Sequence, residues 1–318
     1  MKRVHWTLVF SGLILTSGLM AGDRLPRVEE RSFAARGSIR LELVSGDCLL
    51  RTGAAGKIEV RVESDFDPAD FHPQFVERGE VVVLKEEFSG RAHGRSVWKV
   101  TVPASTVIDC ESASGDVKAA GGTAGITVRT ASGDVDLQDF SGGCRVQTAS
   151  GDIDLARVKG GLEVKTASGD IHGERLDGPQ TRLASASGDI ALARAGGELR
   201  VSTASGDIEV TEGTFAAAAK FASASGDVSL KLAASPAADL NIATASGDVE
   251  LDYAGHPMAG TFTLTTKKGG EIRAPFPFGA EEEFLKHGQT YVRKSAVRRG
   301  ATPRIEIDTA TGSIELRE

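Results

Sequence analysis

The tripeptide Ser-Gly-Asp recurs through the middle of the chain at a nearly constant interval. Successive aspartates of the eight copies are 18, 18, 18, 19, 18, 20 and 21 residues apart. A fixed period of this length is typical of repeat proteins, in which each unit packs mainly on its neighbours. The aspartates are Asp116, Asp134, Asp152, Asp170, Asp189, Asp207, Asp227 and Asp248.

Apolar and polar residues alternate on both sides of each tripeptide. With the aspartate as position 0, positions −8, −6, +1 and +3 are mostly apolar, and the positions between them are mostly polar. In the second copy these four positions hold Ile126, Val128, Val135 and Leu137. A period of two predicts two short strands per repeat, with the four columns facing a core.

The segment between the two predicted strands reads as a structural turn. A Thr or Ser at position −4 should face inward near the corner, with its hydroxyl satisfied by backbone or by a neighbouring rung. We expect the glycine to permit a positive φ angle and the aspartate to accept a backbone N–H. Representative turn residues are Ser132, Gly133, Asp134, Ser150, Gly151, Asp152, Ser168, Gly169 and Asp170.

Two architectures fit this repeat. Each unit could be one coil of a solenoid, or each Ser-Gly could close a hairpin in a long antiparallel meander. We favour an all-β, single-stranded β-solenoid (β-helix-like) with rungs of about 18 residues, because a meander would need an open sheet of about 16 strands. Handedness and cross-section stay open.

The flanking regions look like degenerate rungs and caps. We predict a small N-terminal β region over 22–103, with strands at 58–62, 81–84 and 97–102 and a loop marked by Pro68 and Pro73. An early copy of the motif lies at 44–48. Regular repeats should span 104–252, and the N-terminal β region should cover the first rung, whose strand edges would otherwise be unpaired.

Residues 253–318 read as degenerate rungs with an insertion. A late copy, with Ser in place of Asp, lies at 309–316, and a poorer copy lies at 266–270. Within the insertion, Glu281 to His287 could form one short helix.

The first 21 residues resemble a secretory signal. Lys2 and Arg3 precede an apolar run from Trp6 to Leu19, which is short for a membrane span. Cleavage near Gly22 would leave no apolar stretch long enough to cross a bilayer, and an uncleaved anchor is the alternative. We therefore expect an exported protein, periplasmic, secreted or on the cell surface.

The net charge argues against one class of partner, and the cysteine positions predict core side chains. The formal net charge of −7 disfavours nucleic acid. Cys48, Cys110 and Cys144 are an odd number of cysteines, which is no disulfide framework, and their positions predict small buried hydrophobic side chains.

The segment Trp98 to Pro103, followed by Ser112-Ala113-Ser114-Gly115-Asp116-Val117, resembles the bacterial "putative adhesin" β-strand-repeat family. In that family an exported Val-x-Val-Pro strand leads into Thr-x-Ser-Gly-Asp-Val repeats. The resemblance covers roughly 39–318 and implies a role at the cell envelope, without naming a ligand. The Pro-Phe-Pro-Phe insertion near 275–278 departs from the family pattern.

No catalytic constellation accompanies the repeated serines. A serine nucleophile needs a base, and His172 is the only histidine among the regular rungs. The Ser-x-x-Lys match at Ser96 and Lys99 lies in an alternating strand, where those side chains face opposite sides. We therefore predict no enzyme, catalytic residue or cofactor. A polysaccharide-active β-helix is the enzymatic alternative, and it would need a cleft with convergent charged residues around 270–300.

The column of eight aspartates could carry one ligand. In register, the carboxylates would lie about 4.8 Å apart and repel one another. Backbone N–H groups are one way to offset that repulsion, and calcium bridging between rungs is the other.

We therefore predict an adhesin-like envelope protein with a rigid polar surface that binds a glycan, an envelope polymer or a protein. A passive envelope scaffold and a stress-sensing accessory protein are the alternatives.

Overall fold

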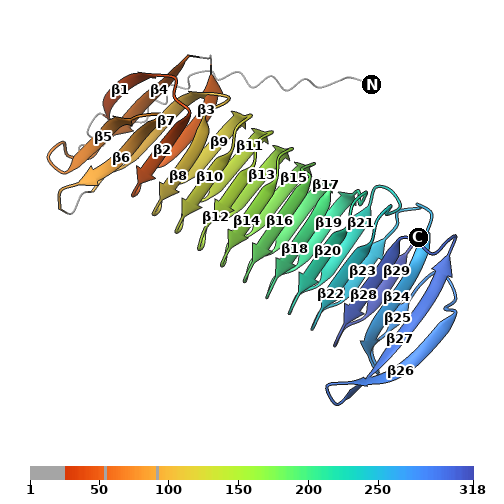
Figure 1. The fold of residues 1–318 in the computed structure, drawn as a ribbon. Helices are drawn as coiled ribbons and strands as arrows, with labels where there is room; N and C mark the ends of the chain where they lie inside the picture. Colours follow the sequence, from red (N-terminus) through yellow and green to blue (C-terminus); the bar gives the residue numbers. More distant parts are fainter. Residues whose placement is uncertain (1–25, 54–55, 91–92) are drawn as a thin grey trace, which may run out of the picture.

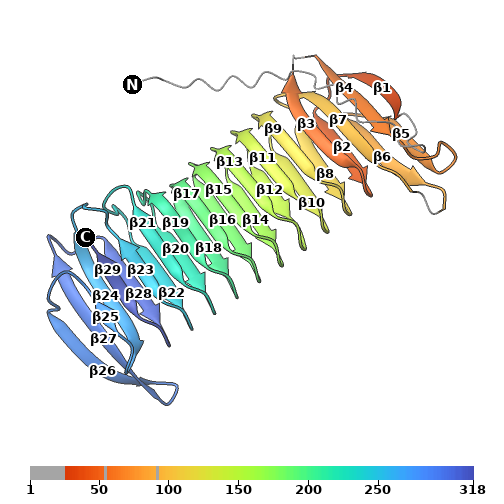
Figure 2. The same cartoon turned by 180° about the vertical axis from the view of Figure 1, so that it is seen from behind.

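The computed structural model describes residues 26–53, 56–90 and 93–318, and every regular element in those residues is a β-strand. The predicted signal at 1–21 lies outside the described residues. The strands form an elongated solenoid made of two sheets, with the N-terminal and C-terminal regions at opposite ends (Figures 1 and 2). No helix in the described part is long and apolar enough to cross a membrane.

Sheet A has 14 strands. In spatial order they are β1 (Arg27–Ala34), β4 (Lys57–Ser64), β7 (Ser96–Pro103), β3 (Asp47–Gly53), β9 (Val117–Gly122), β11 (Val135–Phe140), β13 (Ile153–Val158), β15 (Ile171–Leu176), β17 (Ile190–Ala195), β19 (Ile208–Gly213), β21 (Val228–Leu232), β23 (Val249–Asp252), β29 (Ile314–Arg317) and β25 (Ile272–Arg273).

Sheet B has 15 strands. In spatial order they are β26 (Ala280–Lys286), β27 (Gln289–Arg298), β24 (Gly260–Lys267), β28 (Arg304–Thr309), β22 (Leu240–Thr244), β20 (Ala219–Ser223), β18 (Glu198–Thr203), β16 (Gln180–Ser185), β14 (Leu162–Thr166), β12 (Cys144–Gln147), β10 (Ile126–Thr130), β8 (Val107–Ser112), β2 (Ser38–Leu43), β6 (Val81–Phe88) and β5 (Phe71–Arg78).

Parallel pairing in register confirms the solenoid and excludes the meander. Val135 pairs with Val117 on one side and Ile153 on the other, so like positions of successive repeats are neighbours. Each repeat adds one strand to each sheet. Sheet size does not distinguish the two architectures, because both observed sheets have nearly as many strands as the meander would have had.

The four predicted apolar columns form the core between the sheets. Val128 and Leu137 are fully buried, as are most of their equivalents. The three cysteines are free and buried, as predicted. A fifth column, at position +6, is also buried and was not predicted: Phe140, Val158, Leu176 and Ala195.

The column at +6 can face inward because the residue before it is left-handed. Position +5 has a φ of 56 to 61° in five successive rungs, and this reverses the alternation that +1 and +3 begin. The residues are Asp139, Arg157, Arg175, Arg194 and Glu212.

The chain does not stack its rungs in sequence order at the N-terminal end. The early motif copy joins β2 to β3, which pair directly with β8 and β9. Strands β6 and β7 then stack outside β2 and β3, and β1, β4 and β5 pair antiparallel at the end. The three predicted strands lie in β4, β6 and β7. The loop assignment was wrong for Pro73, which lies inside the edge strand β5, where proline is tolerated.

A buried carboxylate joins the outer N-terminal rung to the first corner. Glu86 on β6 accepts the backbone N–H groups of Val44, Ser45 and Gly46 at 2.8, 3.0 and 3.1 Å. It also accepts the Trp98 indole N–H at 2.8 Å and the hydroxyl of Ser96. The corner hydroxyl of the regular rungs is absent here, because Leu43 holds that position, and Glu86 replaces it.

The C-terminal end repeats this arrangement. The late motif copy joins β28 to β29, which pair with β22 and β23, and β24 and β25 lie outside them. The last strands of the chain are therefore inserted between earlier ones (Figure 1). The predicted helix at 281–287 is wrong: Glu281 to Lys286 lie in β26, which forms a hairpin with β27. Cross-strand pairing overrides the helical propensity of a short acidic run.

Candidate functional site

The Ser-Gly-Asp corner is built by close backbone contact between rungs. A Cβ atom on Gly151 would lie 2.6 Å from the carbonyl carbon of Gly133 and closer still to its oxygen. The corner glycines do not have positive φ values, so the conformational reason predicted for them was wrong. Glycine is needed here because two backbones approach too closely for a side chain.

Hydroxyl side chains at position −4 accept a backbone N–H of their own corner from Ser112 to Ser223, and from Ser185 onward they also donate to the rung before. Thr203 Oγ1 accepts the N–H of Gly206 at 3.1 Å and donates to the carbonyl oxygen of Gly188 at 3.1 Å. Thr244 donates in the same way to Gly226 at 3.0 Å. These side chains are buried, as expected for inward-facing hydroxyls with partners.

The aspartate column forms a continuous hydrogen-bonded ladder. Oδ1 of Asp134 accepts the backbone N–H of Asp152 at 2.9 Å, and the same bond repeats from Asp47 at one end to Ser313 at the other. The acceptor therefore serves the next rung rather than its own turn. The eight aspartates form no ion pair with another described residue. Within the described ranges no three His, Cys, Asp or Glu side chains converge on a metal position.

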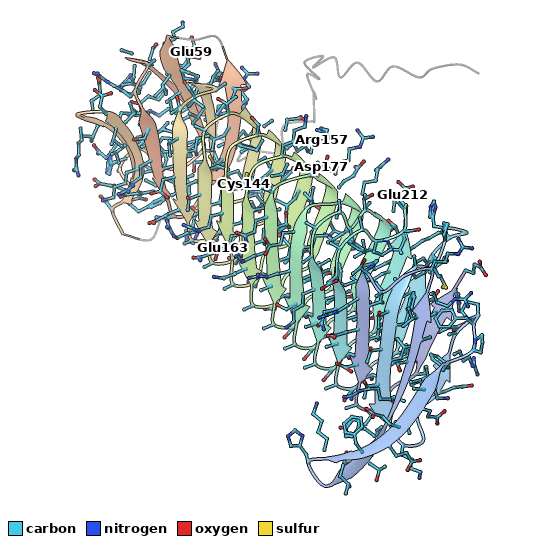
Figure 3. The ribbon with its side chains drawn as sticks, turned by 45° about the vertical axis from the view of Figure 1, so that its right-hand side comes forward. Glu59, Cys144, Arg157, Glu163, Asp177 and Glu212 are labelled. Atoms are coloured by element: carbon cyan, nitrogen blue, oxygen red, sulfur yellow. The ribbon has the colours of Figure 1, made fainter. Side chains whose placement is uncertain are left out.

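The left-handed column at +5 forms the edge of sheet A farther from these corners. Arg157 donates two hydrogen bonds to the Asp139 carboxylate of the preceding rung, Nε to Oδ1 at 2.6 Å and Nη2 to Oδ2 at 2.8 Å. This pairing lowers the pKa of Asp139. Arg194 binds Glu174 at 2.6 Å. Arg157 and Glu212 project along one edge in Figure 3. Ion pairs with carboxylates of the same edge compensate the arginines of this column.

The outer face of sheet B carries a row of cations. Six successive strands from β10 to β20 each present one exposed Arg or Lys. The cations are distributed over two adjacent register columns, and only Arg182, Arg200 and Lys220 are direct neighbours in one column, at the roughly 4.8 Å spacing of adjacent strands. Glu163 pairs with two of them, Arg145 at 3.1 Å and Lys165 at 2.7 Å. The row consists of Arg129, Arg145, Lys165, Arg182, Arg200 and Lys220.

Compensation weakens toward β16, β18 and β20. Arg182 binds only the amide oxygen of Gln180, at 2.6 Å. Arg200 pairs with Glu198 at 2.9 Å, and the Lys220 side chain has no partner in the described part of the chain. Small side chains such as Ser202 and Ala222 lie beside the row, so the cations border a smooth surface.

The outer face of sheet A has the opposite sign over the same rungs. A shallow hollow of about 620 Å³ crosses β11 to β19, with an alanine floor and a rim that includes Asp154, His172, Glu174 and Glu209. His172 Nδ1 lies 3.8 Å from Asp154 Oδ1, and no serine or cysteine is among the described residues that line the hollow. The hollow therefore gathers charged side chains, and the described residues that line it include no nucleophile in contact with a base.

The C-terminal insertion does not gather free carboxylates. Glu281 pairs with Lys294 at 3.5 Å, Glu282 with Arg293 at 2.6 Å and Glu283 with Lys268 at 2.9 Å. Each carboxylate is thus held by a cation of the same hairpin or of the turn after β24. The acid and base pair that a glycoside hydrolase needs is not formed by these three groups.

The profile of the Toastrack DUF4097 family matches residues 91–275. The chain belongs to that family. The match covers the regular rungs and agrees with the predicted resemblance at the level of an adhesin-like β-strand-repeat family.

No curated protein matches the chain. A solved structure described as a "putative cell adhesion protein" from Clostridium sporogenes ATCC 15579 is 11% identical, with 92% of this chain and 99% of that chain covered and a TM-score of 0.22. That score is too low to indicate a shared arrangement of strands. The Toastrack match and the observed rungs agree with a β-strand-repeat protein.

Proposed function

We propose that this Toastrack protein is exported and binds an extended anionic envelope polymer, such as an acidic glycan, along the outer face of sheet B. The supporting observation is the row of six exposed cations on successive strands. A row of like charges on a rigid ladder suits a polymer that repeats its own charges, because many weak contacts add up.

The composition of the face favours ionic contact. The outer positions of sheet B between β8 and β22 hold no aromatic side chain, so stacking against neutral sugar rings has no platform there. Carboxylate or phosphate groups can instead form charge-assisted hydrogen bonds with Arg and Lys. Arg182, Arg200 and Lys220 are the residues proposed to contribute most, since carboxylates compensate them least.

The test uses alginate and polyphosphate as anionic probes and dextran as the neutral one. The triple variant Arg182→Gln, Arg200→Gln, Lys220→Gln should lose binding to the anionic probes by about tenfold or more, at low salt. A matched triple variant, Lys57→Gln, Lys159→Gln, Lys231→Gln, removes the same charge elsewhere and should bind normally. Equal loss in both variants would reduce the effect to net charge and contradict the proposed face.

Localisation needs its own measurement. Protease accessibility on intact native cells, with fractionation alongside, should place the protein outside the cytoplasm. Exposure on the cell surface would support adhesion to an external polymer. Protection inside the envelope would favour an internal scaffold or a stress-sensing accessory protein, and recovery in the cytoplasm would refute export.

A further inference from the structure

The outer face of sheet A changes sign along the solenoid axis. Lys99 on β7, Arg51 on β3 and Lys118 on β9 form a cationic block. Asp136 on β11 and Asp154 on β13 begin an acidic block directly beside it. The face is therefore self-complementary in charge when two copies meet with their axes reversed.

The inner members of both blocks are poorly compensated within one chain. Lys118 has no side-chain partner among the described residues, and Arg51 donates only to the Thr101 hydroxyl, at 3.1 Å. Asp136 accepts the amide N–H groups of Gln138 at 3.0 and 3.2 Å. Asp154 has a histidine at 3.8 Å as its nearest ionisable partner. These charges are available to a partner.

An apolar hollow lies where the two blocks meet. It measures about 490 Å³, and Leu49, Leu50, Ala119 and Ala120 contribute to its lining. Leu49 is 37% exposed and occupies a position that holds a charged residue in the next three rungs. An apolar centre with a charged surround is the usual composition of a protein–protein interface.

We propose that this face binds a second copy of the chain in a two-fold symmetric, face-to-face dimer. Lys118 and Asp136 are register partners on adjacent strands. A two-fold axis parallel to the strands and passing between β9 and β11 exchanges those positions. It brings Lys118 over the partner's Asp136 and, by symmetry, repeats that pair.

The same operation places β3 over β13 of the partner. In this register Leu49 lies over the partner's Asp154 and Arg51 over the partner's Ala156, so the ionic contact between Arg51 and the partner's Asp154 is a diagonal one between neighbouring columns. Six strands of about five residues cover roughly 500 Å² per copy, or about 1,000 Å² in total. That area is at the low end for specific complexes, so the dimer should form at micromolar concentration and weaken with salt.

The dimer covers both A faces and leaves both B faces outward, on opposite sides of the assembly, whatever ligand the B face binds. A ligand of the B face would then meet a bivalent particle.

Charge exchange tests the interface by sedimentation velocity on the mature chain at low salt. Lys118→Asp alone and Asp136→Lys alone should each raise the dimer dissociation constant at least tenfold, because each creates like-charge pairs across the axis. An equimolar mixture of the two variants should dimerise as well as wild type, since both pairs become complementary again. Lys231→Asp, exposed on β21 outside the proposed interface, is the matched control and should dimerise normally.

Circular dichroism of each variant should be that of wild type, so that loss of folding is recognised. A wild-type protein that stays monomeric up to about 100 μM would overturn the proposal, since an interface of this size should form below that concentration. Failure of the mixture to recover would overturn it equally. Loss of acidic-polymer binding in Lys118→Asp, with no change in association state, would assign the face to a polymer instead.

Discussion

Replacing one corner glycine tests the physical basis of the whole repeat. Gly151 lies in the middle of the regular rungs, and an added Cβ atom would lie 2.6 Å from the Gly133 carbonyl carbon and 3.1 Å from the Asp134 nitrogen. Both obstacles are backbone atoms, which no rotamer change can move. The two corners would have to separate by roughly 1 Å to reach ordinary contact.

The expected loss follows from the bonds at that corner. Separation stretches Ser150 N–H to Ala131 oxygen, now 3.1 Å, and Asp152 N–H to Asp134 Oδ1, now 2.9 Å. With about 1–2 kcal/mol for each weakened bond at a corner with little room for water, Gly151→Ala should cost about 2–4 kcal/mol.

Gly143 provides the control in the same rung. A Cβ atom there would meet only the Gly161 oxygen at 3.8 Å, an ordinary contact. Both substitutions restrict the unfolded chain equally, which by itself stabilises by about 0.4–1 kcal/mol. The difference between the two variants therefore isolates the backbone clash.

Urea unfolding followed by far-ultraviolet circular dichroism measures the effect. The midpoint should fall clearly for Gly151→Ala and stay near wild type for Gly143→Ala. Equal midpoints for the two variants would refute the view that close backbone approach, rather than backbone conformation, requires glycine at the corner.

Four further predictions concern buried side chains and the corner carboxylates. Glu86→Gln should lower the free energy of unfolding by about 2–5 kcal/mol, because an amide leaves buried hydrogen-bond donors unmatched. Trp98 fluorescence during urea unfolding measures this loss, and an unchanged midpoint would contradict the anchoring role of Glu86. The buried thiols should resist maleimide at pH 8 until the protein unfolds, since burial raises the pKa of Cys144 to about 12; rapid labelling of the native protein would contradict this. Hydrogen bonds from Ser313 lower the pKa of Asp248. The stability that this carboxylate contributes is therefore present above its unfolded pKa, near 4, and is lost as pH falls through the lower folded pKa. Proteolysis of the C-terminal rung should become faster below about pH 4, and the increase over the rate at neutral pH should be smaller in Asp248→Asn. The melting temperature should be the same in EDTA and in millimolar calcium at matched ionic strength, because backbone N–H groups already bind one oxygen of each corner carboxylate, whereas a rise specific to calcium would assign the cation to that edge.

Much of the candidate surface could be anticipated from single columns of the repeat. Alternation around each tripeptide identifies inward residues such as Val128 and outward residues such as Arg145. It does not identify the inward Phe140, because that requires Asp139 to adopt a left-handed conformation, and an unbroken alternation would point Phe140 outward. Apolar residues spaced three apart, at +3 and +6, were the available signal.

The ends of the molecule depended on contacts between distant parts of the chain. The acidic run at Glu281 reads locally as a helix, yet pairing with Lys294 across a hairpin makes it a strand. The late motif copy reads as a final rung, yet it stacks directly on β22 and β23 inside earlier strands. Local propensity is worth less than the burial and hydrogen bonds that such pairing supplies.

The sequence by itself determined the repeat, the two strands per rung and the apolar columns, because a solenoid residue contacts mainly its equivalents one rung away. The tertiary structure alone decided the spatial order of the terminal rungs, the role of Glu86 and the cationic block that β7, β3 and β9 form on the outer face of sheet A. Those properties arise from which strands become neighbours, and the free energy of that choice comes from long-range pairing that no local pattern encodes.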